Sequence, residues 1–221
     1  MRIKLQKRRS KVLLGQRKSK GDSKAKSGDP RWDHFAQKAK NEGYASRAVY
    51  KLAEIDRRFR LFKPGQRVLD LGCAPGGWLQ YVAKKITASG RVVGIDRVPV
   101  EMHTAPIRTL VGDLLEEVDL GEDAAPFDVV LSDMAPDTIG VRHVDQVRSA
   151  ELTRIAFEWA LRWGAPGVAF VAKAFQGPDF EILLKEIKVA FTKVKCVRPE
   201  ATRKESIEVY VVATDKRSRG C

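Results

Sequence analysis

From residue 67 onward, short apolar runs rich in β-branched residues alternate with longer helical stretches, and this alternation limits the possible folds most. The apolar runs, which we predict to be strands, are residues 67–71, 91–96, 107–111, 127–132, 167–173, 194–197 and 208–213. Apolar residues spaced three and four apart predict helices over residues 46–59, 78–86, 144–163 and 178–191. Such alternation builds right-handed βαβ units, so we expect an α/β fold: a seven-stranded, mostly parallel sheet with helices on both faces. The last two runs are joined by a short loop without a helix, so the last strand should be antiparallel.

The positive charge of the chain is concentrated at its beginning. The formal net charge is +13, and residues 1–31 hold 12 Lys and Arg against 2 Asp and Glu, leaving the remainder nearly neutral. We therefore expect three parts: a basic, disordered arm (1–31), a single globular domain (32–215) and a short basic tail (216–221). The arm could add contacts to nucleic-acid phosphates. Two alternatives are less well supported: the charges of the arm could serve only to keep the protein soluble, or the arm could be a transit peptide.

Composition excludes several classes of protein. No stretch approaches the roughly 18 consecutive apolar residues of a membrane span, and the beginning lacks the apolar run of a secretory signal, so we expect a cytoplasmic protein without membrane contact. The three cysteines, Cys73, Cys196 and Cys221, have no C-x-x-C spacing, which argues against disulfides or structural zinc. His34, His103 and His143 show no metal-ligand grouping, and we expect no metal. We also expect a monomer.

A glycine-rich turn follows the first predicted strand. Residues 70–78 read DLGCAPGGW, and glycines between a strand and a helix let the backbone approach a ligand closely. The spacing differs from the G-x-G-x-x-G that seats a pyrophosphate, so the loop suits a nucleoside ligand without phosphates. A purely structural turn is the alternative.

Acidic residues follow the next two predicted strands. Asp96 ends the second, where a carboxylate can accept hydrogen bonds from both ribose hydroxyls. Asp113 follows the third, where it could accept from an adenine amino group. Either residue alone would more often be a cap or turn residue, but their placement after consecutive strands favours a nucleoside site.

A lysine and an aspartate stand at the ends of the fourth and fifth predicted strands. Asp133 follows the fourth, and Lys173 ends the apolar run 168–172. Partial loss of water there would lower the pKa of Lys173, which could then act as a base or orient an oxygen nucleophile. The alternative, a lysine whose ammonium reaches solvent, becomes weaker with Asp133 on the neighbouring strand.

Five ordered motifs resemble the FtsJ (RrmJ, RlmE) family of ribosomal RNA methyltransferases over about residues 33–213. They are SRAVYKL at 46–52, DLGCAPGGW at 70–78, SDMAP at 132–136, KAFQG at 173–177 and EVY at 208–210. The resemblance implies a Rossmann-like class I methyltransferase whose cofactor is S-adenosylmethionine. It also implies the acceptor of the methyl group, which is the ribose 2′-oxygen of a uridine in the RNA of the large ribosomal subunit.

The resemblance also implies the site residues. The catalytic Lys-Asp-Lys-Glu tetrad of the family falls on Lys51, Asp133, Lys173 and Glu208. Its cofactor contacts fall on Gly76, Trp78, Asp96, Asp113 and again Asp133.

Several other functions compete with this interpretation. An amino methyltransferase would carry a D/N/S-P-P-aromatic tetrapeptide where SDMAP stands, and a pyrimidine C5 enzyme needs a cysteine there, whereas Cys73 is better explained as a packing residue. A transfer RNA ribose methyltransferase and a non-catalytic ribosome-assembly factor remain as alternatives. Residues 31–40 mix basic and aromatic side chains, which suits either an RNA contact or, slightly better, a helix face docked on the core.

Overall fold

The computed structural model describes residues 30–102, 104–202 and 206–217. Nearly all of the expected basic arm, His103 and the last four residues of the expected tail lie outside the described residues. The division into arm, domain and tail therefore stays a prediction.

The described chain contains one seven-stranded sheet. Its strands are β1 (Arg67–Leu71), β2 (Arg91–Asp96), β3 (Ile107–Val111), β4 (Phe127–Ser132), β5 (Gly164–Phe175), β6 (Phe191–Val197) and β7 (Glu208–Lys216). Their order across the sheet is β3-β2-β1-β4-β5-β7-β6. The first five strands pair in parallel, and β7 is antiparallel to both β5 and β6. The mostly parallel sheet with an antiparallel last strand is confirmed.

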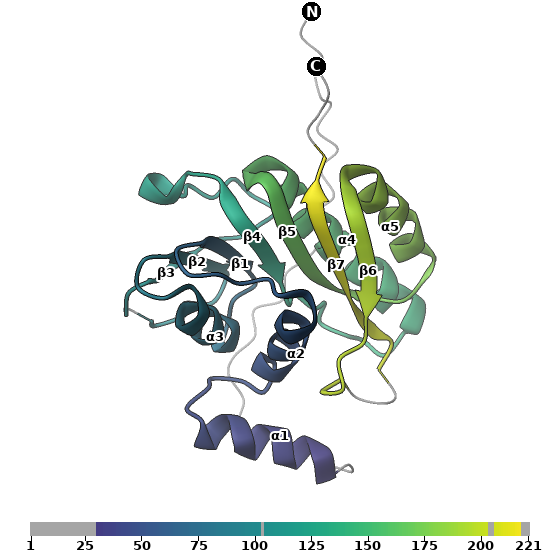
Figure 1. Cartoon of the computed structure of the whole chain (residues 1–221). Helices are drawn as coiled ribbons and strands as arrows, with labels where there is room; N and C mark the ends of the chain where they lie inside the picture. Colours follow the sequence, from purple (N-terminus) through teal and green to yellow (C-terminus); the bar gives the residue numbers. More distant parts are fainter. Residues whose placement is uncertain (1–29, 103, 203–205, 218–221) are drawn as a thin grey trace, which may run out of the picture.

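Helices cover both faces of this sheet (Figure 1). They are α1 (Pro30–Asn41), α2 (Val49–Phe59), α3 (Gly77–Ile86), α4 (Arg142–Trp163) and α5 (Pro178–Ala190), with a short 3-10 helix at Gly121–Asp123. Apolar residues of α2 and α3 pack with Val68 and Val129, while those of α4 and α5 pack with Leu69 and Val130. Successive side chains of a strand point to opposite faces, which is why neighbouring residues of β1 and β4 enter different cores. No helix of the described ranges is long and apolar enough to cross a membrane.

Several element boundaries differ from those expected. We predicted a helix through residue 191 and a strand from 194, but α5 ends at Ala190 and β6 begins at Phe191. Phe191 is buried and its ring packs near Phe157 and Phe170. Burial of an aromatic ring does not distinguish the last turn of a helix from the first residue of a strand, so the sequence pattern could not place this boundary.

The segment of residues 31–40 is helical, which is what the slightly favoured interpretation of this segment predicted. Helix α1 spans Pro30–Asn41; Ala39 is buried, and the ring of Phe35 lies 5.5 Å from that of Tyr50 on α2. Figure 1 places α1 below α2, away from the sheet. The contact between Phe35 and Tyr50 therefore joins this helix to α2.

The strand order places a cleft at β1 and β4. The chain runs outward from β1 through β2 to β3 and then returns to the other side of β1 for β4 and β5. The connections after β1 and β4 thus lead to opposite faces, and a space opens above the carboxyl ends of these two strands. The glycine loop and the residues after β2, β3 and β4 all border this point.

Candidate active site

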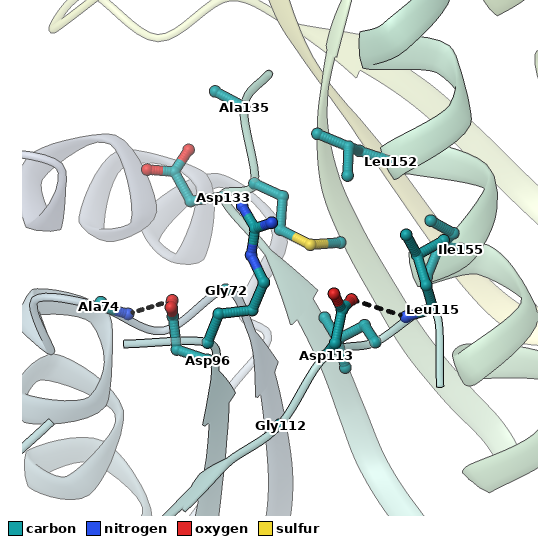
Figure 2. Close-up of a pocket in the computed structure, with 13 residues that line it drawn as sticks. Gly72, Ala74, Asp96, Gly112, Asp113, Leu115, Asp133, Ala135, Leu152 and Ile155 are labelled. Atoms are coloured by element: carbon teal, nitrogen blue, oxygen red, sulfur yellow. Dashed lines mark hydrogen bonds between the residues drawn. The ribbon is translucent and has the colours of Figure 1, made fainter. Parts of the chain in front are cut away.

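A cavity of about 270 Å³ opens at the carboxyl ends of β1, β2, β3 and β4. Its walls include Gly72 and Ala74 after β1, Asp96 at the end of β2, Asp113 after β3, Asp133 after β4, and Leu152 and Ile155 of α4. Figure 2 shows Asp96 and Asp113 on this cavity, with the two apolar side chains of α4 beside it. Three of the predicted cofactor residues therefore line one cavity, as parallel strands with adjacent carboxyl ends require.

The two acidic residues beyond β2 and β3 are held by backbone amides (Figure 2). Asp96 accepts hydrogen bonds from the backbone N–H of Ala74 at 2.9 Å through Oδ2 and of Val98 at 2.9 Å through Oδ1. Oδ1 of Asp113 accepts from the N–H of Leu115 at 3.0 Å. Because a carboxylate has about four lone-pair sites, both keep acceptors for ligand hydroxyl or amino groups. These two acceptors fit the ribose hydroxyls and the adenine amino group of S-adenosylmethionine.

Gly72 lines the floor of the cavity, where a side chain would not fit. Its φ is +76°, and a Cβ there would lie 2.4 Å from Cγ of Met134. The sequence did not single out this glycine within the loop. Gly76, which it did, has a φ of +101° and precedes α3, and its Cα faces Met102 and Val100 instead of either cavity described here. Of these two glycines, Gly72 is the one that lines the cavities.

A second, smaller cavity of about 140 Å³ shares Gly72, Ala74 and Asp133 with the first. It is further lined by Ser46, Ala48, Asp70, Cys73, Pro75, Gly77 and Trp78. The indole Nε1 of Trp78 donates to the carbonyl of Ala48 at 2.9 Å, which fixes this wall to the segment before α2. The shared residues show that the two cavities adjoin at the glycine loop and at Asp133.

The four tetrad candidates form two ion pairs at the edge of this site. Lys173 Nζ lies 3.0 Å from Oδ1 of Asp133 and also donates to the backbone carbonyl of Asp133 at 2.5 Å. Lys51 Nζ donates to Oε1 of Glu208 at 2.5 Å, and both of those side chains are 12% exposed. The residues come from α2, the turn after β4, β5 and β7, so the structure brings together all four.

Tyr210 lies between the two ion pairs, and the sequence analysis predicted no role for it. Its hydroxyl donates to Oδ1 of Asp133 at 2.6 Å, and Lys51 Nζ lies 5.7 Å from the centre of its ring. Burial, together with the charges of Asp133 and Glu208, raises the pKa of Tyr210 well above its ordinary value of 10.0. The hydroxyl therefore stays a donor. Period-two alternation from Glu208 along a strand could have revealed that Tyr210 shares its face.

Cys73 is a buried packing residue, as expected. Burial is also the main cause that raises the pKa of its thiol. A Cβ on Gly94 would lie 2.7 Å from its sulfur, which shows how closely the loop packs against β2. A thiol that keeps its proton is a poor nucleophile, which argues against cysteine-based base methylation.

A nucleoside cavity at the β1–β4 switch point, with paired lysines and carboxylates beside it, defines a Rossmann-like methyltransferase. The FtsJ-like methyltransferase family model matches residues 44–216, and the chain belongs to that family. Its cofactor is S-adenosylmethionine.

Two relatives carry the name ribosomal RNA large subunit methyltransferase E. The protein from Syntrophobacter fumaroxidans is 49% identical over 185 residues, covering 81% of this chain and 93% of its own length. The protein from Desulfatibacillum aliphaticivorans is 44% identical over 196 residues, covering 87% of this chain and 95% of its own.

Two solved structures share the fold. A ribosomal RNA methyltransferase from Plasmodium falciparum is 25% identical with a TM-score of 0.69, covering 80% of this chain and all of its own. A SAM-dependent O-methyltransferase from Thermotoga maritima, with 14% identity and a TM-score of 0.53, covers 76% of this chain and 66% of its own and is similar in fold alone.

Proposed function

We propose that this protein transfers the methyl of S-adenosylmethionine to the ribose 2′-oxygen of a uridine in the RNA of the large ribosomal subunit. The observation that carries this proposal is the pair of lysine–carboxylate contacts, Lys173–Asp133 and Lys51–Glu208, beside the two adjoining cavities. Two relatives that align over nearly their whole length carry names that specify large-subunit ribosomal RNA.

The residues divide between holding the cofactor and holding the acceptor. Asp96 and Asp113 would bind the ribose and the adenine, Gly72 would let the ligand approach the backbone, and Trp78 would border the amino-acid end. We retain Gly76 as a residue that shapes the loop at the start of α3. S-adenosylmethionine supplies a methyl on a positively charged sulfur, which is open to attack by a weak nucleophile.

Methyl transfer needs the 2′-oxygen and the methyl carbon to be in line. Lys173 would donate a hydrogen bond to the 2′-oxygen and so direct another of its lone pairs toward the methyl carbon. Asp133 fixes the ammonium of Lys173 from two sides, with its carboxylate and its carbonyl. Lys51, held by Glu208, would position the ribose. As the carbon–oxygen bond forms and the carbon–sulfur bond breaks, the hydroxyl proton passes to solvent.

The test is methyl transfer from labelled S-adenosylmethionine to large ribosomal subunits, free ribosomal RNA and transfer RNA in separate reactions. Mass spectrometry of nuclease fragments then locates the label. We expect it on the 2′-oxygen of one uridine of the large-subunit RNA. Label on a base, or on transfer RNA alone, would overturn the proposal.

Substitution of Lys173 separates an enzyme from an assembly factor that only uses this fold. Lys173→Ala should lower the rate of methyl transfer about 100-fold or more, because it removes the positioned donor, while cofactor affinity stays the same. An assembly factor would keep its full effect on subunit assembly in this variant. Isothermal titration with S-adenosylhomocysteine checks that the cofactor site is intact.

We further propose that the protein acts as a monomer in the cytoplasm, where ribosomal subunits are assembled in bacteria. All four tetrad candidates come from one chain, so the proposed chemistry needs no second copy. Light scattering at increasing protein concentration tests this, and a stable dimer would contradict it.

A further inference from the structure

Three polar side chains lie along one face of α4, where this helix packs against β5. They are Gln146, Ser149 and Thr153, spaced three and four apart, and both Ser149 and Thr153 are 1% exposed. A helix face turned toward a sheet normally carries apolar residues, as it does further along α4 at Ala156 and Ala160. The proposed reaction gives the polar residues no role, so their burial needs another explanation.

Each of the three side chains bonds to the backbone at the end of β5. The hydroxyl of Thr153 donates to the carbonyl of Lys173 at 2.9 Å and lies 2.8 Å from the carbonyl of Ser149, so its proton is shared between them. The hydroxyl of Ser149 accepts from the N–H of Phe175 at 2.9 Å. The side-chain amide of Gln146 donates to the carbonyl of the residue that follows β5. One helix face thus holds the strand end from Lys173 onward.

These hydrogen bonds stand where a neighbouring strand would otherwise bond. The pairing of β4 with β5 extends to Ser132 and Ala172, whereas β5 continues to Phe175. The residue after β4, Asp133, contacts the side chain of Lys173 instead. Buried backbone N–H and C=O groups need partners, and beyond β4 the hydroxyls of α4 provide them. Strand β4 can therefore end early and leave the space in which the cavities open.

The place of Lys173 is thus determined from two sides. Asp133 holds its ammonium, and Thr153 holds its backbone carbonyl. The same helix carries Leu152 and Ile155, whose side chains line the first cavity (Figure 2). One rigid element therefore contacts both the cofactor cavity and the backbone of the lysine that would direct the 2′-oxygen. In-line transfer depends on the distance between these two places.

We propose that Thr153 and Ser149 are positioning residues for methyl transfer, whose hydroxyls fix the end of β5 and so keep the ammonium of Lys173 in place relative to the methyl group. This inference rests on the proposed function in giving Lys173 a part in the reaction. Thr153 and Ser149 are absent from the walls of both cavities described above, so they act through Lys173 and not on the cofactor.

The test removes one hydroxyl and measures the rate and cofactor binding separately. Thr153→Val keeps the shape of the buried side chain and leaves the carbonyl of Lys173 without its donor. We expect kcat for methyl transfer to large ribosomal subunits to fall about 3- to 10-fold, the value of one hydrogen bond. Affinity for S-adenosylhomocysteine, measured by isothermal titration, should stay the same. Thr153→Ser, which restores the hydroxyl, should recover most of the lost rate.

Two further variants separate positioning from a general effect on the fold. Asp123→Asn changes a buried carboxylate that lies 2.9 Å from Arg91 and lines neither cavity. It should lower the melting temperature and leave kcat unchanged at a temperature where the variant is folded. Ser149→Ala removes the acceptor for the N–H of Phe175 and should lower kcat as Thr153→Val does. It also provides the test if Thr153→Val does not fold.

Distinct results would overturn distinct claims. If kcat is unchanged in Thr153→Val and Ser149→Ala, or if Thr153→Ser is as slow as Thr153→Val, the hydroxyls do not position Lys173. The same conclusion follows if cofactor affinity falls by the same factor as the rate, or if Asp123→Asn slows the reaction equally. If the wild-type protein transfers no methyl, or Lys173→Ala transfers it at the wild-type rate, the proposed function is itself wrong.

Discussion

At the scale of single residues, two buried groups near the cavities differ in their hydrogen-bond partners. Tyr210 donates a hydrogen bond to Asp133, while neither carboxyl oxygen of Asp70 has a partner among the described residues. The pKa of each group is raised, in both cases mainly by burial.

The raised pKa of Asp70 has a consequence for stability. The unfolded carboxyl ionises near its ordinary pKa of 3.8, while the folded one stays protonated to higher pH. The folded state then binds more protons than the unfolded state, so stability is lost as pH rises above about 4. Asp70→Asn does not titrate, so its free energy of unfolding relative to wild type should increase from pH 4 to pH 7. Urea denaturation at several pH values measures this, and a constant difference would contradict it.

Removal of the Tyr210 hydroxyl should slow methyl transfer without weakening cofactor binding. Tyr210→Phe keeps the buried ring and removes the donor to Oδ1 of Asp133, which leaves Lys173 less firmly placed. We expect kcat to fall about 10-fold, as for loss of a hydrogen bond to a charged group, with an unchanged KM for S-adenosylmethionine. Steady-state kinetics would separate the two constants. An unchanged kcat with a lower melting temperature would mean that the hydroxyl serves only the fold.

At the scale of elements, the opposite ends of β1, β2 and β3 are held together by charge. Asp123 accepts from Arg91 of β2 and Arg108 of β3, and its backbone carbonyl accepts from Arg67 of β1 at 3.0 Å. This cluster lies at the beginnings of the strands, while the cofactor cavities lie at their carboxyl ends. The charged cluster and the cofactor cavities therefore lie at opposite ends of the same strands.

This division predicts how Asp123→Asn behaves. Loss of the buried charge leaves Arg91 and Arg108 with the exposed Glu122 as their shared acidic partner and should lower the free energy of unfolding by about 2 kcal/mol. Cofactor affinity at the other edge should not change. Guanidinium denaturation and calorimetry on the same sample test both statements, and a variant as stable as wild type would show that the cluster is not needed.

At the scale of the whole molecule, the positive charge and the chemistry occupy different parts of the sequence. Residues 1–29 hold 11 Lys and Arg against 2 Asp and Glu, while the tetrad candidates all lie between residues 51 and 208. Charges that neutralise phosphates add affinity and salt dependence but no choice of nucleotide.

Deletion of residues 1–29 should therefore weaken binding to ribosomal RNA and reduce the slope of log affinity against log salt concentration. Affinity for S-adenosylhomocysteine should stay the same, because α1 begins at Pro30 and the cavities are lined by later residues. Filter binding at several salt concentrations measures the first effect and calorimetry the second. A loss of cofactor affinity would show that the segment belongs to the folded domain.

Much of this protein was determined by local sequence. Alternation of apolar runs with helical stretches predicted the sheet, and the glycine loop with Asp96 and Asp113 predicted where a nucleoside would bind, because parallel strands bring their carboxyl ends to one edge. Asp133 and Lys173 were predicted from their places at the ends of neighbouring strands, whereas Lys51 and Glu208 came from a resemblance in motifs, since nothing in their spacing says that α2 approaches β7.

Only the tertiary structure decided which polar groups are buried and which hydrogen-bond partners they have. Asp70 and Asp96 are both aspartates near the ends of adjacent strands, yet Asp96 accepts two backbone N–H groups, and within the described part of the chain Asp70 accepts none. Tyr210 reads as one more apolar strand residue until β7 pairs with β5 and sets it beside Lys173. The physical reason is that burial and hydrogen bonding depend on contacts between residues distant in the chain, which local pattern does not encode.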